Sequence, residues 1–128
     1  MLSWVQAAEW VEIRGNFPKG SAEKWIPYIE NAEHVIALRV EGESMTAPMG
    51  KSYPSGCIIF VDTKRRSPVS GERVVAVEFG KPYATFKVYR KEEDRCWLEA
   101  RNPDKDAYPS IKEDFRVIGT VVGKWEAE

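Results

Sequence analysis

The sequence predicts a single compact, mostly-β domain of six or seven short strands with little helix. Three observations support this fold class. The apolar runs are short and rich in Val, Ile, Phe and Tyr, which favour strands. Most of the eight prolines and nine glycines lie between these runs, where they mark turns. A length of 128 residues with 43% hydrophobic residues allows one packed core and hardly two.

The N-terminal part of the chain predicts an extended arm. Small and apolar residues dominate positions 2–10, and glycine and proline then interrupt any regular pattern. Ser21 can cap a short helical turn, but Pro27 limits its length. We therefore expect residues 1–20 to form an arm and residues 21–128 to form the folded domain.

Strand signals follow Asn31, where the apolar periodicity changes to two. The expected strands are His34–Val40, Cys57–Val61, Arg73–Phe79, Tyr83–Tyr89, Cys96–Ala100 and Phe115–Val122. The second of these is apolar throughout, which predicts burial on both of its faces. Gly80-Lys81-Pro82 predicts a hairpin connection, and the prolines and glycines within 46–56 and 102–109 predict loops.

Bulk charge argues against direct nucleic-acid binding by this segment. The 19 basic and 20 acidic residues give a net charge of −1, so there is no basic surplus to attract phosphates. The cluster Lys64-Arg65-Arg66 is interpreted as a solvated turn. No run approaches the ~20 apolar residues that cross a bilayer, and no signal peptide is recognisable. We expect a cytoplasmic protein without a membrane partner.

Cysteine and histidine usage predicts neither a disulfide nor a metal site. Cys57 and Cys96 lie far apart, each beside apolar residues, which suits two buried reduced thiols. The one histidine, His34, has no nearby ligand partners. No metal and no cofactor is therefore expected.

Ser44 and Lys87 are the candidate catalytic residues, although each also has an ordinary structural interpretation. The first strand ends just before Gly42, two residues ahead of Ser44, so the hydroxyl lies where the backbone leaves the sheet. On this stretch alone a simple turn serine is favoured. Strand alternation places Lys87 on one face with Thr85 and Tyr89, where a solvated lysine is the common case.

Taken together, these pieces resemble a known family from about Trp4 to Gly123: the self-cleaving domain of LexA-like proteins and lambda-type phage repressors, a Ser/Lys peptidase family. Their order and spacing carry the resemblance, which also implies a fold like that of LexA and signal peptidases. The matching segments are Ser3-Trp4-Val5-Gln6-Ala7, Val40-Glu41-Gly42-Glu43-Ser44-Met45-Thr46-Ala47-Pro48, Pro54-Ser55-Gly56, Ile58-Ile59-Phe60-Val61-Asp62, Thr85-Phe86-Lys87, Asn102-Pro103, Tyr108-Pro109 and Val117-Ile118-Gly119-Thr120-Val121-Val122.

The resemblance implies that Ser44 is a nucleophile and Lys87 its general base. A neutral lysine amine can take the serine proton without histidine or metal. Because a free lysine has a pKa of about 10.4, burial must lower that pKa by a few units. The backbone N–H groups of Ser44 and Glu43 are the expected oxyanion donors.

In this family the scissile bond is typically Ala-Gly in the arm, and here the corresponding pair is Ala7-Ala8. Glycine adopts backbone angles that are closed to alanine, so we expect the Cβ of Ala8 to slow or block cleavage. A natural tolerance and a deliberate substitution both remain open. Trp4, Val5 and Trp10 are the expected anchors of the docked arm.

The implied function is the C-terminal domain of a phage-type transcriptional repressor, which forms a homodimer and cleaves itself. RecA filaments are expected to stimulate cleavage in the SOS response. Operator DNA is expected to contact only an N-terminal domain absent from this sequence. The alternatives are a non-enzymatic dimerisation module whose cleavage is lost or blocked, and a UmuD-like accessory subunit of a translesion polymerase. Membrane signal peptidases share the chemistry, but the expected anchor is missing.

Overall fold

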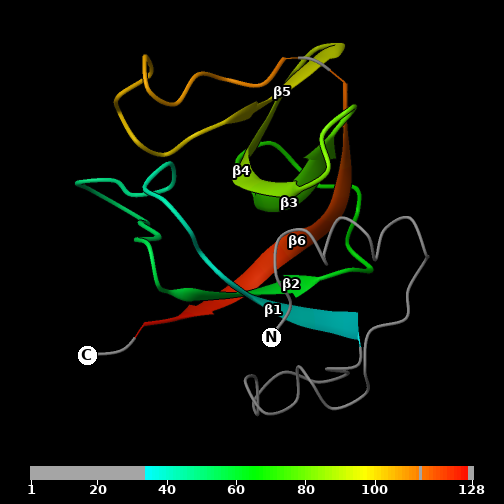
Figure 1. The fold of residues 1–128 in the computed structure, drawn as a ribbon. Helices are drawn as coiled ribbons and strands as arrows, with labels where there is room; N and C mark the ends of the chain where they lie inside the picture. Colours follow the sequence, from blue (N-terminus) through cyan, green and yellow to red (C-terminus); the bar gives the residue numbers. More distant parts are fainter. Residues whose placement is uncertain (1–33, 113, 127–128) are drawn as a thin grey trace.

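Residues 34–112 and 114–126 are described by a computed structural model, and they form one six-stranded antiparallel sheet (Figure 1). The strands are β1 (Val35–Arg39), β2 (Ile58–Asp62), β3 (Arg73–Glu78), β4 (Ala84–Glu92), β5 (Arg95–Glu99) and β6 (Phe115–Trp125). Their order across the sheet is β1-β2-β6-β3-β4-β5. No α-helix occurs in these described ranges, which confirms the predicted fold class. The predicted arm and the helical turn at Ser21 lie outside them.

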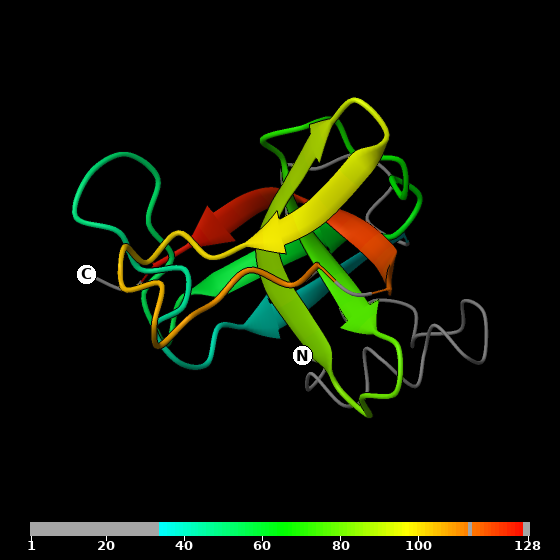
Figure 2. The ribbon, with the colours of Figure 1, turned by 90° about the horizontal axis from the view of Figure 1, so that it is seen from above.

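Strand β6 joins the two halves of the sheet. Its N-terminal part pairs with β3 and its C-terminal part pairs with β2 (Figure 1). The register shifts once in each pairing, between Val75 and Ala76 of β3 and between Phe60 and Val61 of β2. Such irregularities bend a strand and increase its twist, so β1 and β2 curl away from β3, β4 and β5. Figure 2 shows this curvature from above.

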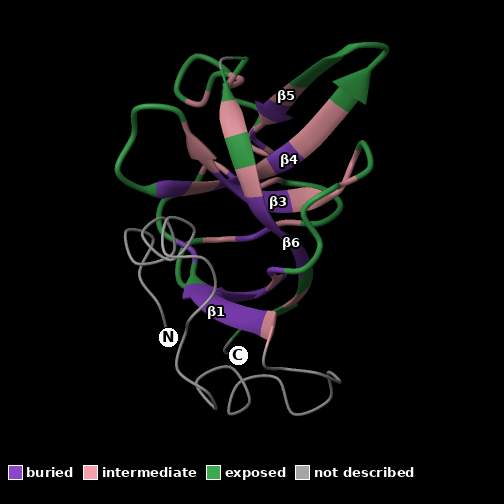
Figure 3. Ribbon diagram, turned by 90° about the vertical axis from the view of Figure 1, so that its right-hand side faces the viewer, coloured by how far each residue is buried: buried purple, intermediate pink, exposed green. Residues whose placement is uncertain are grey.

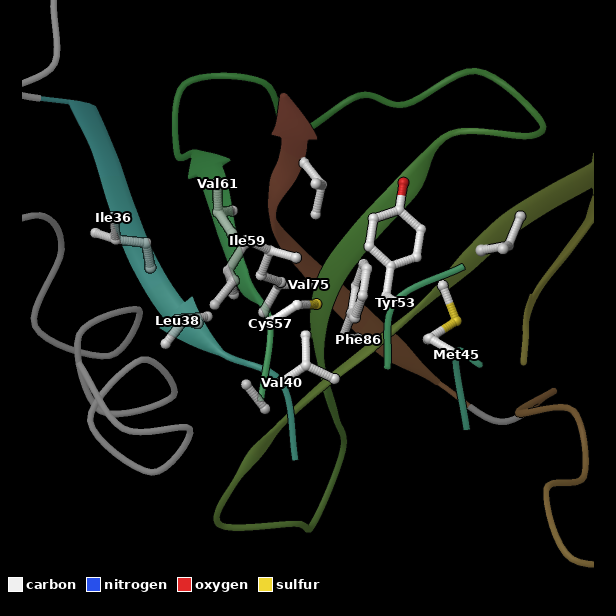
Figure 4. Close-up of a cluster of buried hydrophobic side chains, with 14 residues drawn as sticks. Ile36, Leu38, Val40, Met45, Tyr53, Cys57, Ile59, Val61, Val75 and Phe86 are labelled. Carbon is white, nitrogen blue, oxygen red and sulfur yellow. The ribbon is translucent and has the colours of Figure 1, made fainter. Parts of the chain in front are cut away.

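One face of the curved sheet encloses the main hydrophobic core. Side chains from β1, β2, β3, β4 and β6 meet there, together with residues of the loop that links β1 to β2 (Figure 4). Strand β1 is buried along most of its length (Figure 3), and β2 is buried from Ile58 to Val61 as predicted. The Tyr53 ring packs edge-on against Phe86, with ring centroids 5.0 Å apart. The core therefore anchors both the loop around Tyr53 and strand β4.

Two of the predicted strands are longer in the structure. β4 continues to Glu92, because its backbone pairs with β5 through residues whose charged side chains hide the strand pattern. β6 continues to Trp125 through its pairing with β2. The exposed turn at Lys64-Arg65-Arg66 agrees with the prediction.

The prediction of two buried thiols was wrong for Cys96. Cys57 is buried, but Cys96 is exposed. Cys96 pairs with Lys91 near the tip of the β4–β5 hairpin, on the edge strand of the sheet, where little of the domain covers it. The apolar residue next to it in sequence, Trp97, was therefore a poor guide to the burial of Cys96.

Gly119 of β6 provides a test of how closely the two halves of the sheet approach. A Cβ at this position would lie 2.6 Å from the Val61 Cγ1 atom and 2.8 Å from the Asp62 carbonyl oxygen. We expect Gly119→Ala to lower the free energy of unfolding by about 1–3 kcal/mol, because backbone cannot yield as a side chain can. Gly123→Ala is the matched control, since its Cβ would meet only Phe60 at 3.6 Å. Equal urea melting curves for both variants would contradict this reading of β6.

Candidate active site

The serine lies in a tight turn directly after the first strand. Gly42 has a φ of +81°, a conformation that glycine adopts without steric cost. The Thr46 N–H then donates to the Glu43 carbonyl at 3.1 Å, which closes a turn with Ser44 and Met45 at its centre. The Met45 side chain is buried in the core, so the turn is fixed beneath the serine. The Glu43 carboxylate accepts a hydrogen bond from the Thr46 hydroxyl.

Lys87 comes to this turn from the middle of β4. The Lys87 Nζ atom lies 3.1 Å from Ser44 Oγ, 2.9 Å from Thr85 Oγ1 and 3.2 Å from the Phe86 carbonyl oxygen. Alternation along β4 explains the direction of the side chain, because Phe86 and Val88 are buried in the core. Two residues that are 43 positions apart in sequence are thus within hydrogen-bond distance.

The surroundings of Lys87 favour its neutral form. Burial lowers the pKa of the Lys87 amine from its ordinary value of 10.5 to about 8. The nearby carboxylate of Glu78 opposes this shift by stabilising the charged form. Burial is the larger effect, so Lys87 becomes neutral as the pH rises through about 8, where an ordinary lysine is still charged. A neutral amine can accept the proton of the Ser44 hydroxyl.

A cleft of about 360 Å³ opens beside the two side chains. Its walls combine apolar side chains with the reactive groups: Val40, Glu41, Ser44, Tyr83, Ala84, Thr85, Phe86 and Lys87. An extended peptide could reach the Ser44 hydroxyl through this opening. Among the described residues, no backbone carbonyl accepts a hydrogen bond from the N–H of Glu43 or Ser44.

Of the predicted site residues, the structure brings Glu43, Ser44 and Lys87 together, whereas Ala7 and Ala8 lie outside the described residues. In the same described ranges, no cluster of three or more His, Cys, Asp or Glu side chains could hold a metal ion. No helix found there is long and apolar enough to cross a membrane.

Two contributors to the site were not identified from the sequence. Thr85 accepts a hydrogen bond from Lys87; strand alternation placed the two residues on one face, but no role was predicted for Thr85. Asn102 donates from its side chain to the Glu43 carbonyl oxygen at 2.9 Å, and its backbone N–H donates to the Ser44 carbonyl at 2.9 Å. No local pattern predicts a contact across 59 positions.

The amino-acid sequence is similar to a known protein family and to several known repressors. Residues 1–122 match the family described as Peptidase S24-like. The chain is 38% identical to repressor protein C2 of Salmonella phage P22, over 95% of this chain and 56% of that protein. It is 38% identical to an HTH-type transcriptional regulator of conjugative element R391 from Providencia rettgeri, over 94% of this chain and 56% of the relative.

A LexA repressor of Leptospira interrogans is 36% identical, over 84% of this chain and 51% of that repressor. The chain therefore spans about half the length of these curated relatives.

Proposed function

Because this chain belongs to the Peptidase S24-like family, we propose that it is the C-terminal domain of a repressor and cleaves its own N-terminal arm. The proposed nucleophile is Ser44, the base is Lys87 and the cleaved bond is Ala7-Ala8. The 3.1 Å contact between Lys87 Nζ and Ser44 Oγ is the observation that carries this proposal. The family match agrees with the resemblance inferred from the sequence.

The proposed reaction follows from the two side chains. Neutral Lys87 removes the hydroxyl proton as Ser44 Oγ attacks the carbonyl carbon of Ala7. The N–H groups of Ser44 and Glu43 stabilise the resulting oxyanion. The Lys87 ammonium then gives its proton to the amine of Ala8 as the Ala7-Ala8 bond breaks, so that residues 1–7 stay on Ser44 as an ester and Ala8 becomes the new N-terminus of the domain. Water attacks the acyl-enzyme ester, again with Lys87 as base, and frees Ser44.

The Thr85 hydroxyl supports Lys87 in this scheme. By accepting a hydrogen bond at 2.9 Å it holds the Lys87 amine beside Ser44 in either protonation state. Pre-orientation of this kind raises the rate because the base need not search for the serine. Because the arm belongs to the same chain, the attack on its peptide bond is intramolecular, which raises the rate further.

The partners belong to the same proposal. The relatives are a phage repressor, an HTH-type regulator and a LexA repressor, and the proposal includes the homodimer and the cytoplasmic location that the resemblance to such repressors implies. A RecA filament would promote cleavage, and operator DNA would contact a separate N-terminal domain. Salt-dependent DNA binding by this segment is not expected, because its net charge is −1.

The test compares the wild-type chain with Ala8→Gly and Ser44→Ala during incubation at pH 9, followed by intact-mass analysis. We expect a fragment that begins at residue 8 in the wild type, faster release in Ala8→Gly because glycine fits more backbone conformations, and none in Ser44→Ala. If all three chains gave the same masses, intact or cut, this function would be wrong.

Ala8 favours a second candidate function, a repressor dimerisation module whose cleavage is blocked. The Cβ at this position replaces the glycine of the typical Ala-Gly pair. Under this alternative the wild-type chain stays intact and Ala8→Gly is cut. The same experiment therefore separates an active domain from a blocked one.

A further inference from the structure

The connection between β5 and β6 runs beside the serine turn (Figures 1 and 2). Asn102 of this connection contacts the turn twice. Its side-chain Nδ2 donates to the Glu43 carbonyl oxygen, and its backbone N–H donates to the Ser44 carbonyl oxygen, each at 2.9 Å. Two successive carbonyl groups on either side of the serine are therefore held by one residue.

These contacts fix the direction of a group that would take part in the reaction. The Glu43 carbonyl and the Ser44 N–H belong to the same planar trans peptide, in which the C=O and N–H bonds point in opposite directions. Holding the Glu43 oxygen toward Asn102 therefore turns the Ser44 N–H to the other side of the turn. Ser44 lines the cleft and Asn102 does not, so Asn102 acts from behind the turn.

Asn102 is itself held in place. Its Oδ1 atom accepts a hydrogen bond from the Asp104 N–H at 2.9 Å, which fixes the orientation of the amide and directs Nδ2 at Glu43. The neighbouring Arg101 holds a different segment, donating to the carbonyl oxygens of Met49 and Lys51 at 3.0 Å each. The connection thus has one contact for the serine turn and another for the loop beyond it.

We infer that Asn102 is a positioning residue that orients the Glu43-Ser44 peptide so that the Ser44 N–H faces the oxyanion of the tetrahedral intermediate. This inference rests on the proposed self-cleavage. Oxyanion donors act only when they are aimed at the developing charge before the reaction begins. Without the Asn102 amide, the Thr46 N–H is the one donor left to the Glu43 carbonyl within the described part of the chain, and the peptide is less firmly oriented.

Asn102→Asp is the sharpest variant. It keeps the side-chain shape, the acceptor for the Asp104 N–H and the backbone donor to Ser44, but it replaces the donor to the Glu43 oxygen with a charged acceptor. Asn102→Ala removes the same donor without adding charge, and it also removes the acceptor for the Asp104 N–H. Arg101→Gln is the matched control, because it weakens the same connection without touching the serine turn.

The experiment measures two reactions of each chain at pH 9. The first is self-cleavage, and the second is labelling by a fluorophosphonate, read by intact mass. In the labelling step the Ser44 Oγ–P bond forms, fluoride leaves and the proton passes to Lys87, so this reaction does not depend on the arm. We expect both Asn102 variants to be about 10- to 100-fold slower in each reaction that the wild type performs.

Arg101→Gln should keep its rate within about twofold of the wild type, as a change distant from the reacting atoms. The midpoint of the pH–rate profile should stay unchanged in Asn102→Ala, because Lys87 is not disturbed. Wild-type rates in both Asn102 variants would overturn the inference, as would an equal loss in Arg101→Gln. If the wild-type chain reacts with the fluorophosphonate but does not cleave itself, the labelling rates of the variants still test the role of Asn102. Such a result contradicts only the proposed cleavage of the arm. A wild type that does neither overturns the proposed function and this inference with it.

Discussion

Lys87→Met is expected to reduce self-cleavage by about 10²- to 10⁴-fold or more, since general bases contribute factors of that size. Methionine fills similar space but has no group that can accept the Ser44 proton. The loss should match that of Ser44→Ala, because two residues that act as one unit do not give additive effects. Release of the arm fragment at pH 9, followed by mass spectrometry, measures the rate.

Lys91→Met is the matched control for this prediction. Lys91 lies on the same strand, but its side chain is exposed and distant from the serine turn. Its replacement should leave the rate unchanged. The wild-type rate should rise about tenfold per pH unit below the Lys87 pKa of about 8 and level off above it. A lysine base would be ruled out by a profile that stays flat between neutral pH and pH 10.

Local sequence features predicted most of the sheet. The apolar run that became β2 and the alternation around Phe86 both reflect burial, which is a property of single residues and their neighbours. The extra length of β4 was not predictable in this way. Its last residues are held by backbone pairing with β5, and backbone pairing leaves no signature in charged side chains.

In the site, too, local features were predictable from the sequence and long-range contacts were not. Gly42 marked the turn because its φ is one that glycine tolerates, and the face of Lys87 followed from alternation. The meeting of Ser44 with Lys87 was implied only by resemblance, because it depends on how the sheet curves. Asn102 belongs to a segment that carries the resemblance, but its role was not predicted, since its contact with Glu43 joins two loops whose relative position is set by the whole fold.

Burial of Lys87 should also make the stability of the domain depend on pH. The folded-state pKa of about 8 lies below the ordinary value of 10.5, so the unfolded chain binds more protons between these two pH values. The free energy of unfolding therefore rises with pH across this window. Below about pH 8 the lysine is protonated in both states, and its burial costs about 3 kcal/mol.

The difference between wild type and Lys87→Met isolates this contribution, because other groups titrate equally in both chains. We expect the variant to be the more stable chain at pH 7 and the wild type to gain about 3 kcal/mol on it by pH 10.5. Urea melts at half-unit pH steps would measure the change, and Lys91→Met should show none of it. If the difference did not change with pH, Lys87 would have an ordinary pKa in the folded domain, and burial could not be what prepares it to act as a base.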